Sequence, residues 1–135
     1  MREVFISSDN ILSPLGTTSA ENFLQLSAMH SGIKKHENAM MSDTAFYASL
    51  FGNLDEWINE DGRLESYTKF EKLLIASVKD ALKNSEVDVT DKKTVLIISS
   101  TKGNISLLET EKDAAAVSDK ISLHHSAKRV AEYFG

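Results

Sequence analysis

A continuous apolar run between Thr94 and Ser99 constrains the fold of this chain more than any other feature. The run follows an amphipathic segment from Tyr67 to Asn84, whose apolar residues recur at spacings of three and four. That spacing predicts a long helix, and a run without polar alternation predicts a strand that is buried on both faces. A helix followed by such a strand is typical of an α/β protein with a parallel crossover.

The sequence contains few other candidates for strands. Residues 4–6 and 46–51 are predicted as strands because they are rich in β-branched and aromatic side chains. This is too few for a stand-alone doubly wound sheet. We therefore predict an α/β fold with few, mostly parallel strands and packed helices, in a single partial domain over residues 1–135.

Shorter helices are expected on either side of this unit. One begins at Thr17, Thr18 or Ser19, after a loop that contains the only proline, and ends at Ser31-Gly32. Residues 54–65 are predicted to be a loop or a short helix. Two C-terminal helices are predicted, joined by a small-residue segment at 114–118; they cover residues 105–111 and 122–134.

The polar loop that follows the apolar run is the first place to look for chemistry. It comprises Ser99, Ser100, Thr101, Lys102, Gly103 and Asn104. A strand, a glycine-bearing loop and a helix can bind an anion through backbone N–H groups. The loop is nevertheless no Walker A sequence and no G-x-G-x-x-G, since it has one glycine and its lysine precedes that glycine. The simpler interpretation is that Gly103 turns the chain and Asn104 or Ser106 caps a helix.

Composition excludes several classes of function. A net charge of −5 argues against nucleic acid or an anionic membrane as a partner. The absence of cysteine excludes disulfides, thiolate metal sites and a cysteine nucleophile within these residues. No signal peptide or membrane span is recognisable, which predicts a cytoplasmic protein.

Histidines and carboxylates form no complete active site. His124 and His125 are adjacent, so on a helix they point about 100° apart and cannot chelate one metal. His30 and His36 have no acidic residue at the spacing of metal ligands. No carboxylate pair and no catalytic serine motif is evident, so we assign no catalytic, cofactor-binding or metal-binding residue.

Several segments resemble the N-terminal part of the β-ketoacyl–acyl carrier protein synthases, which are thiolase-like condensing enzymes. Their first strand is followed by a loop ending in S-P-L-G and a helix leading to S-G-I, as at Ser13–Gly16 and Ser31–Ile33. Their long helix and buried strand are similar to "FEKLLIASVKDALKNSEVD" and "TVLIISSTKGNI", and "SAKRVAEYFG" is similar to a later helix. The chain departs from the family in having Ser7-Ser8-Asp9-Asn10 where a T-G-x-G is usual.

The resemblance implies an incomplete N-terminal part of a thiolase-like fold. It also implies a decarboxylative Claisen condensation, in which an acyl thioester reacts with malonyl-carrier protein. The family's cysteine and histidines follow the matching region, so the chain by itself would be inactive. The Ser99–Asn104 loop would be scaffold near the active site. The parent enzyme would be a cytoplasmic homodimer that uses acyl carrier protein and no cofactor.

Two other functions are compatible with the sequence. The chain could be a short binding or assembly module, whose missing strands come from self-association or from a partner. It could also be a nucleotide-binding domain, which the single-glycine loop supports only weakly.

Overall fold

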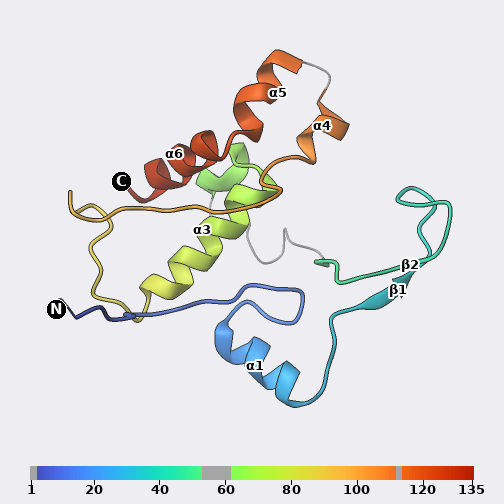
Figure 1. Ribbon diagram of the computed structural model, residues 1–135, viewed down its shortest axis with the longest axis horizontal. Coiled ribbons are helices and arrows are strands. Elements are labelled where there is room, and N and C mark those ends of the chain that lie inside the picture. The colour runs from blue at the N-terminus through green and yellow to red at the C-terminus, as the bar shows by residue number, and fades with distance from the viewer. Residues whose placement is uncertain (1–2, 53–61, 112–113) are drawn as a thin grey trace.

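The computed structural model describes residues 3–52, 62–111 and 114–135. Helices α4, α5 and α6 gather around one end of α3, whereas α1 and the two strands extend away from it (Figure 1). The elements, in chain order, are α1 (Ser19–Ser27), β1 (Lys34–His36), β2 (Phe46–Ala48), the 3-10 helix η1 (Gly62–Ser66), α3 (Lys69–Leu82), α4 (Leu107–Thr110), α5 (Ala114–Ile121) and α6 (Leu123–Phe134).

The predicted α/β fold with mostly parallel strands, an incomplete thiolase-like arrangement, is wrong for this chain. The described residues are mainly helical, and their one sheet is an antiparallel pair in which Lys35 of β1 lies opposite Tyr47 of β2. Residues 4–6 and 94–99 belong to no strand. Figure 1 shows both segments as separate extended traces. A strand needs a neighbouring strand for its backbone hydrogen bonds, and within the described parts of the chain neither segment has one.

Helix α3 confirms the helix predicted over residues 67–84 and forms the centre of the core. Thr68 precedes it, and its hydroxyl and the Glu71 carboxylate each accept the backbone N–H of the other residue. This capping box satisfies N–H groups that a helix end leaves unpaired. Helix α6 packs against α3. The core lies between them and contains Leu64, Ile75 and Val130, with Tyr67, Leu73, Leu74, Ile98, Tyr133 and Phe134 packed against it.

Several other predicted elements were placed correctly, but their bounds or types differ. Helix α6 confirms the helix predicted over residues 122–134, and α4 is shorter than the helix predicted over 105–111. The predicted strand at 46–51 is reduced to β2, and its partner β1 was not predicted. The small-residue connection is instead helix α5, because alanine is the best helix former. Residues 54–61 of the loop or short helix predicted at 54–65 lie outside the described residues, and the remainder falls in η1.

The turn from Ser13 to Gly16 is fixed by a side chain of α1. Ser13 and Gly16 exchange two backbone hydrogen bonds, of 2.9 and 3.1 Å. The Asn22 side chain is buried, and its oxygen accepts a hydrogen bond from the Ser13 hydroxyl. Its amide nitrogen lies 2.9, 3.0 and 2.8 Å from three backbone carbonyl oxygens, those of Ile11, Gly16 and Thr18. The turn and the helix therefore form one rigid unit.

Glu21 closes the N-terminus of α1. Its carboxylate accepts the N–H groups of Thr17 and Thr18, at 2.6 and 3.2 Å, and the Thr17 hydroxyl at 2.9 Å. These hydrogen bonds, that of the Thr17 N–H above all, lower the pKa of Glu21. A Cβ atom on Gly16 would lie 2.5 Å from the Cβ of Glu21, so the close approach requires glycine.

We expect Glu21→Gln to destabilise the chain at neutral pH, and we expect the difference between the two proteins to shrink at about pH 3. A carboxylate whose pKa is lowered by folding stabilises the fold above its unfolded-state pKa, about 4.3. That stabilisation is lost as the pH falls through the folded-state pKa. Urea unfolding of both proteins at the two pH values measures the difference, with the exposed Glu86→Gln as control. A difference that persists unchanged in acid would contradict this role of the charge.

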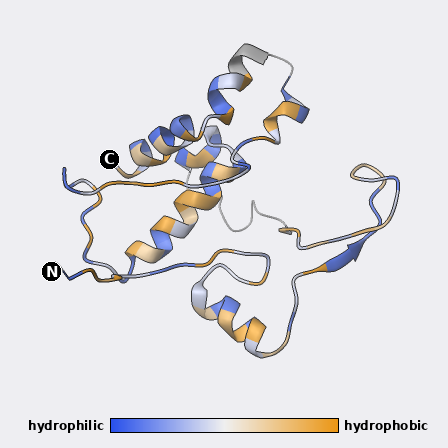
Figure 2. Ribbon diagram, in the orientation of Figure 1, coloured by the Kyte–Doolittle hydropathy of each residue, from blue (hydrophilic) through white to orange (hydrophobic). Residues whose placement is uncertain are grey.

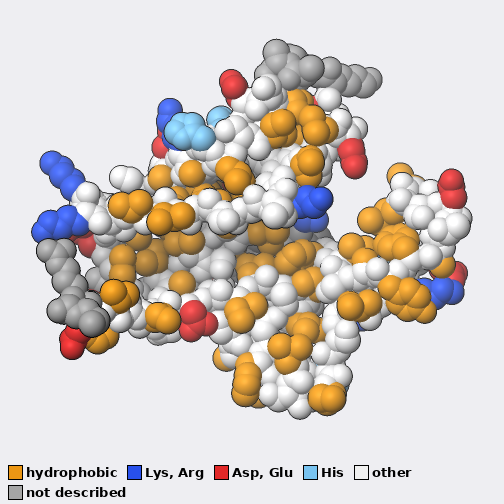
Figure 3. Space-filling view, in the orientation of Figure 1, with side chains coloured by type: hydrophobic (Ala, Val, Ile, Leu, Met, Phe, Trp, Pro, Cys, Tyr) orange, Lys and Arg blue, Asp and Glu red, His pale blue; other side chains and the backbone are white. Residues whose placement is uncertain are grey.

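The chain exposes much more surface than a compact protein of its mass. Its accessible surface is 10486 Å², whereas a folded monomer of this size exposes about 7,000 Å². Much of the excess is apolar. In the two extended segments Val4, Ile6, Val95 and Ile97 are 93%, 90%, 76% and 84% exposed. Figures 2 and 3 show apolar residues along both segments and spread over the face that is in view.

No helix in the described ranges combines the length and the apolar character that a membrane span requires.

Candidate functional site

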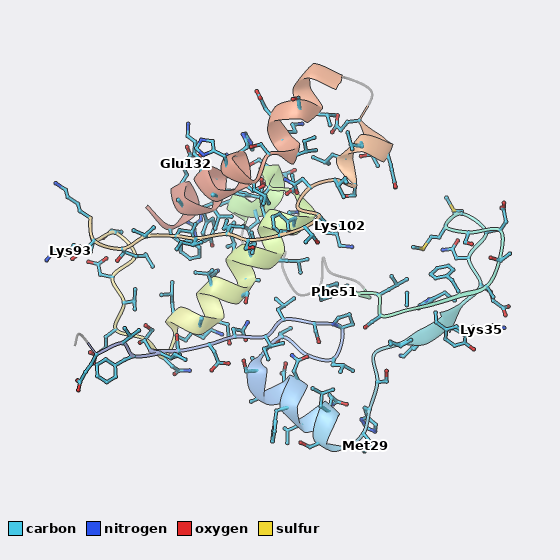
Figure 4. The ribbon with its side chains drawn as sticks, in the orientation of Figure 1. Met29, Lys35, Phe51, Lys93, Lys102 and Glu132 are labelled. Atoms are coloured by element: carbon cyan, nitrogen blue, oxygen red, sulfur yellow. The ribbon has the colours of Figure 1, made fainter. Side chains whose placement is uncertain are left out.

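The loop singled out from the sequence ends in a buried asparagine. Ser99–Asn104 follows the exposed extended segment, and Figure 4 labels Lys93 and Lys102 near the two ends of that segment, which crosses α3. Within the loop, the Ser100 hydroxyl accepts the N–H groups of Lys102 and Gly103, at 3.2 and 2.9 Å. Asn104 is only 2% exposed. The loop is thus anchored at its C-terminal end by the buried Asn104, and the hydrogen bonds to the Ser100 hydroxyl close its turn.

Asn104 joins three helices through one carboxamide. Its nitrogen donates to the Lys120 carbonyl at 2.8 Å and to the Ser126 hydroxyl at 3.1 Å, and lies 3.4 Å from the Glu71 carboxylate. Its oxygen accepts the Thr68 hydroxyl at 2.7 Å. The nitrogen has two hydrogens for three acceptors, so the longest contact, to Glu71, is the weakest. We call Thr68, Glu71, Asn104 and Ser126 the polar cluster.

Glu71 and Ser126 are as deeply buried as Asn104. Glu71 is 2% exposed and Ser126 is fully buried. The Glu71 carboxylate accepts the Thr68 N–H at 3.0 Å, at the N-terminus of α3, where the helix dipole favours negative charge. A buried polar group is costly unless it is hydrogen-bonded, and every member of the polar cluster has a partner.

Gly103 allows Asn104 to reach this position. Its φ of +50° lies in the left-handed region, which favours glycine. An added Cβ would also lie 3.0 Å from a methyl carbon of Leu123, at the start of α6. The single glycine of the loop therefore serves a turn and a close packing contact.

This arrangement suits a structural role better than catalysis. The polar cluster contains no cysteine, histidine or lysine side chain, and its one carboxylate is held by the cap of α3. The N–H groups that a nucleotide phosphate would need at Lys102 and Gly103 are bound to Ser100. The next helix, α4, has four residues. Nothing in the loop geometry favours nucleotide binding.

A cavity of about 380 Å³ adjoins the polar cluster. Arg129 lies 4.2 Å above the centre of the Tyr67 ring and donates to the Ser66 hydroxyl at 3.0 Å. Across the cavity Lys120 and Glu111 form an ion pair at 3.8 Å. Both acidic and basic side chains line the cavity, so their charges favour neither an anionic nor a cationic ligand. His125 also lines it, whereas His124 is exposed and does not.

A second cavity, of about 430 Å³, brings together residues that looked unrelated in the sequence. His30 and His36 both line it, although one follows α1 and the other ends β1. The S-P-L-G and S-G-I segments also meet here: a Cβ on Gly32 would lie 3.5 Å from the Leu15 side chain and 2.5 Å from the Ser49 hydroxyl oxygen. A larger residue at Gly32 would have to displace the Ser49 hydroxyl.

No family model matches the chain, and neither a curated protein nor a solved structure matches it.

Sequence reasoning found Asn104 and missed its partners. Two of the partners had a readable signal, because Thr68 and Glu71 form the T-x-x-E pattern of a capping box. Ser126 carries no such signal, because a serine within a helix is usually exposed.

Proposed function

We propose that this chain is the N-terminal part of a β-ketoacyl–acyl carrier protein synthase-like acyltransferase. It supplies scaffold and no catalytic group. Further polypeptide supplies the catalytic residues and covers the exposed apolar segments. The enzyme performs a decarboxylative Claisen condensation between an acyl thioester and malonyl-carrier protein.

The observation that carries the proposal is that two of the matching segments, Ser13–Gly16 and Ser31–Ile33, pack against each other. The Ser13–Gly16 turn is held by the buried Asn22, and Gly32 packs on Leu15 within that turn. These residues are 17 positions apart in the sequence. The S-P-L-G and S-G-I segments thus lie against each other in this chain, which supports the resemblance.

The excess of exposed surface supports the proposal that further polypeptide covers the exposed apolar segments. About 3,500 Å² more is exposed than a compact protein of this mass would expose. A standard protein–protein interface buries about 800 Å² per partner, so a small partner does not cover this area. A polypeptide of domain size does. The apolar side chains of residues 4–6 and 95–97 are where it would lie.

The chemistry divides between the two parts. The condensation needs a cysteine thiolate to carry the acyl group, and the 135 residues contain no cysteine. The chain contributes the Ser99–Asn104 loop, which the polar cluster holds in place. Under this proposal the acyl groups arrive on acyl carrier protein, and the assembled enzyme is a cytoplasmic homodimer.

Reconstitution from two pieces tests this function. The chain is co-produced with the polypeptide encoded downstream of residue 135, and release of carbon dioxide from malonyl-carrier protein is measured with an acyl donor. We expect no turnover with either piece alone and turnover with both. Failure of the pair to turn over, with a chain that forms one concentration-independent oligomer by itself, would favour the short assembly module instead.

A further inference from the structure

The second cavity differs in charge from the part of the chain that forms it. Residues 1–65 contain ten acidic and four basic side chains. Among the described residues that line the cavity, Lys34 is a cation, His30 and His36 are imidazoles, and none is a carboxylate. A wall with basic groups and no acid favours an anion.

Neighbouring groups hold both imidazole rings. A ring nitrogen of His30, Nδ1, lies 2.7 Å from the Gln25 side-chain oxygen. The Nε2 atom of His36 donates to the Ala48 carbonyl at 3.1 Å, and its ring stacks on Phe46 with 5.4 Å between ring centres. Held side chains lose little freedom when a ligand binds, which favours affinity.

The rest of the wall combines the apolar side chains of Pro14, Leu15, Met29 and Leu50 with the polar Gln25 and Ser31. An inorganic anion would leave the apolar side chains without a partner. An organic anion with a short hydrocarbon part would contact both kinds of wall.

Met29 provides an independent indication, because its backbone is strained. Its φ is +59°, a left-handed conformation that residues other than glycine rarely adopt. It follows α1, where the N–H groups of Met29 and His30 bond the carbonyls of Leu26 and Gln25, at 3.0 and 2.9 Å. Glycine is the usual residue at this position of such a helix end. Strained residues concentrate at functional sites. The side chain retained here lines the cavity.

We propose that the cavity between the end of α1, the Ser13–Gly16 turn and β1 binds a small organic anion with a short apolar chain. Lys34 supplies the charge and the hydrogen-bond donors, the two imidazole rings form part of the wall, and Met29 with Leu15 and Leu50 contacts the hydrocarbon. This site is separate from the polar cluster and does not depend on the condensation reaction.

A pair of neighbouring lysines gives a matched test. Lys34 lines the cavity, whereas Lys35, one residue along β1, points to the other face and pairs with Glu37. Figure 4 labels Met29 at the end of α1 and Lys35 on β1. The 135-residue chain is titrated with hexanoate, hexanol, hexylammonium and inorganic phosphate, and binding is followed by calorimetry and by NMR shifts of residues around the cavity.

We expect saturable binding of hexanoate in preference to the other three probes. Lys34→Gln should weaken it about tenfold, the usual effect of losing a charge-assisted contact. Lys35→Gln should leave it unchanged. Equal binding of hexanol or hexylammonium, equal effects of the two lysine variants, or no saturable hexanoate binding would each overturn the proposal.

Met29→Gly separates a binding role from a structural one. Relief of the backbone strain should raise the midpoint of thermal unfolding, while the lost side chain should weaken hexanoate binding. A variant that is more stable and binds hexanoate as tightly as the original chain would show that Met29 plays no part in a site.

Discussion

Replacing Asn104 with aspartate is expected to destabilise the chain by about 3–5 kcal/mol. The variant loses the N–H donors to Lys120 and Ser126 and places a second carboxylate beside that of Glu71. A buried charge without a counter-charge is among the most costly changes a core can undergo. Asn104→Ala should cost less, about 2–3 kcal/mol, because it leaves polar partners unsatisfied without adding a charge. Urea unfolding followed by far-UV circular dichroism measures both losses.

Asn84→Asp is the matched control, because Asn84 is exposed at the end of α3. Its effect should stay within about 0.5 kcal/mol. Similar losses from Asn104→Asp and Asn84→Asp would contradict the assignment of Asn104 as the residue that fastens the loop to α3, α5 and α6.

Two isoleucine-to-alanine substitutions should have very different effects in the isolated chain. Ile75 on α3 is fully buried between α3 and α6, whereas Ile97 is 84% exposed. Ile75→Ala should cost about 4 kcal/mol, because it removes buried methyl groups and leaves a cavity. Ile97→Ala should cost no more than about 0.5 kcal/mol, because the exposed side chain makes few packing contacts that the substitution removes. Thermal and urea unfolding of both variants give the comparison.

The same pair also tests whether further polypeptide covers this face, as we propose. In the reconstituted enzyme, Ile97→Ala should cost about 2 kcal/mol or more, because the side chain becomes covered. An Ile97→Ala variant that remains neutral after reconstitution would show that nothing covers this face. A large loss already in the isolated chain would contradict the exposed position of the segment.

The helical part of this fold is readable from the sequence because its causes are local. The apolar spacing from Phe70 to Leu82 produces α3, and the same kind of pattern produces α6. The strand predictions at 4–6 and 94–99 failed for a non-local reason. Their residues favour extended backbone, but a ladder also needs a neighbour, and composition does not state whether one is present.

In the candidate sites, too, local features were predicted from the sequence and non-local contacts were not. The sequence places Asn104 at the end of a polar loop, but its contacts reach Thr68 and Glu71, 36 and 33 residues away. His30 and His36 meet at one cavity because a helix end and a strand converge, which no spacing rule detects. Gly32 and Gly103 were noticed as turn residues, whereas the left-handed backbone of Gly103 and the side chains around both glycines are known only from the structure.

The most direct test of the central claim is the nucleotide sequence of the coding region beyond the codon for Gly135. An open frame is expected to continue, with a cysteine among small residues and then two well-separated histidines. The same frame without that cysteine would indicate a non-catalytic partner subunit. A stop codon directly after Gly135 would contradict the claim that this chain is part of a longer acyltransferase.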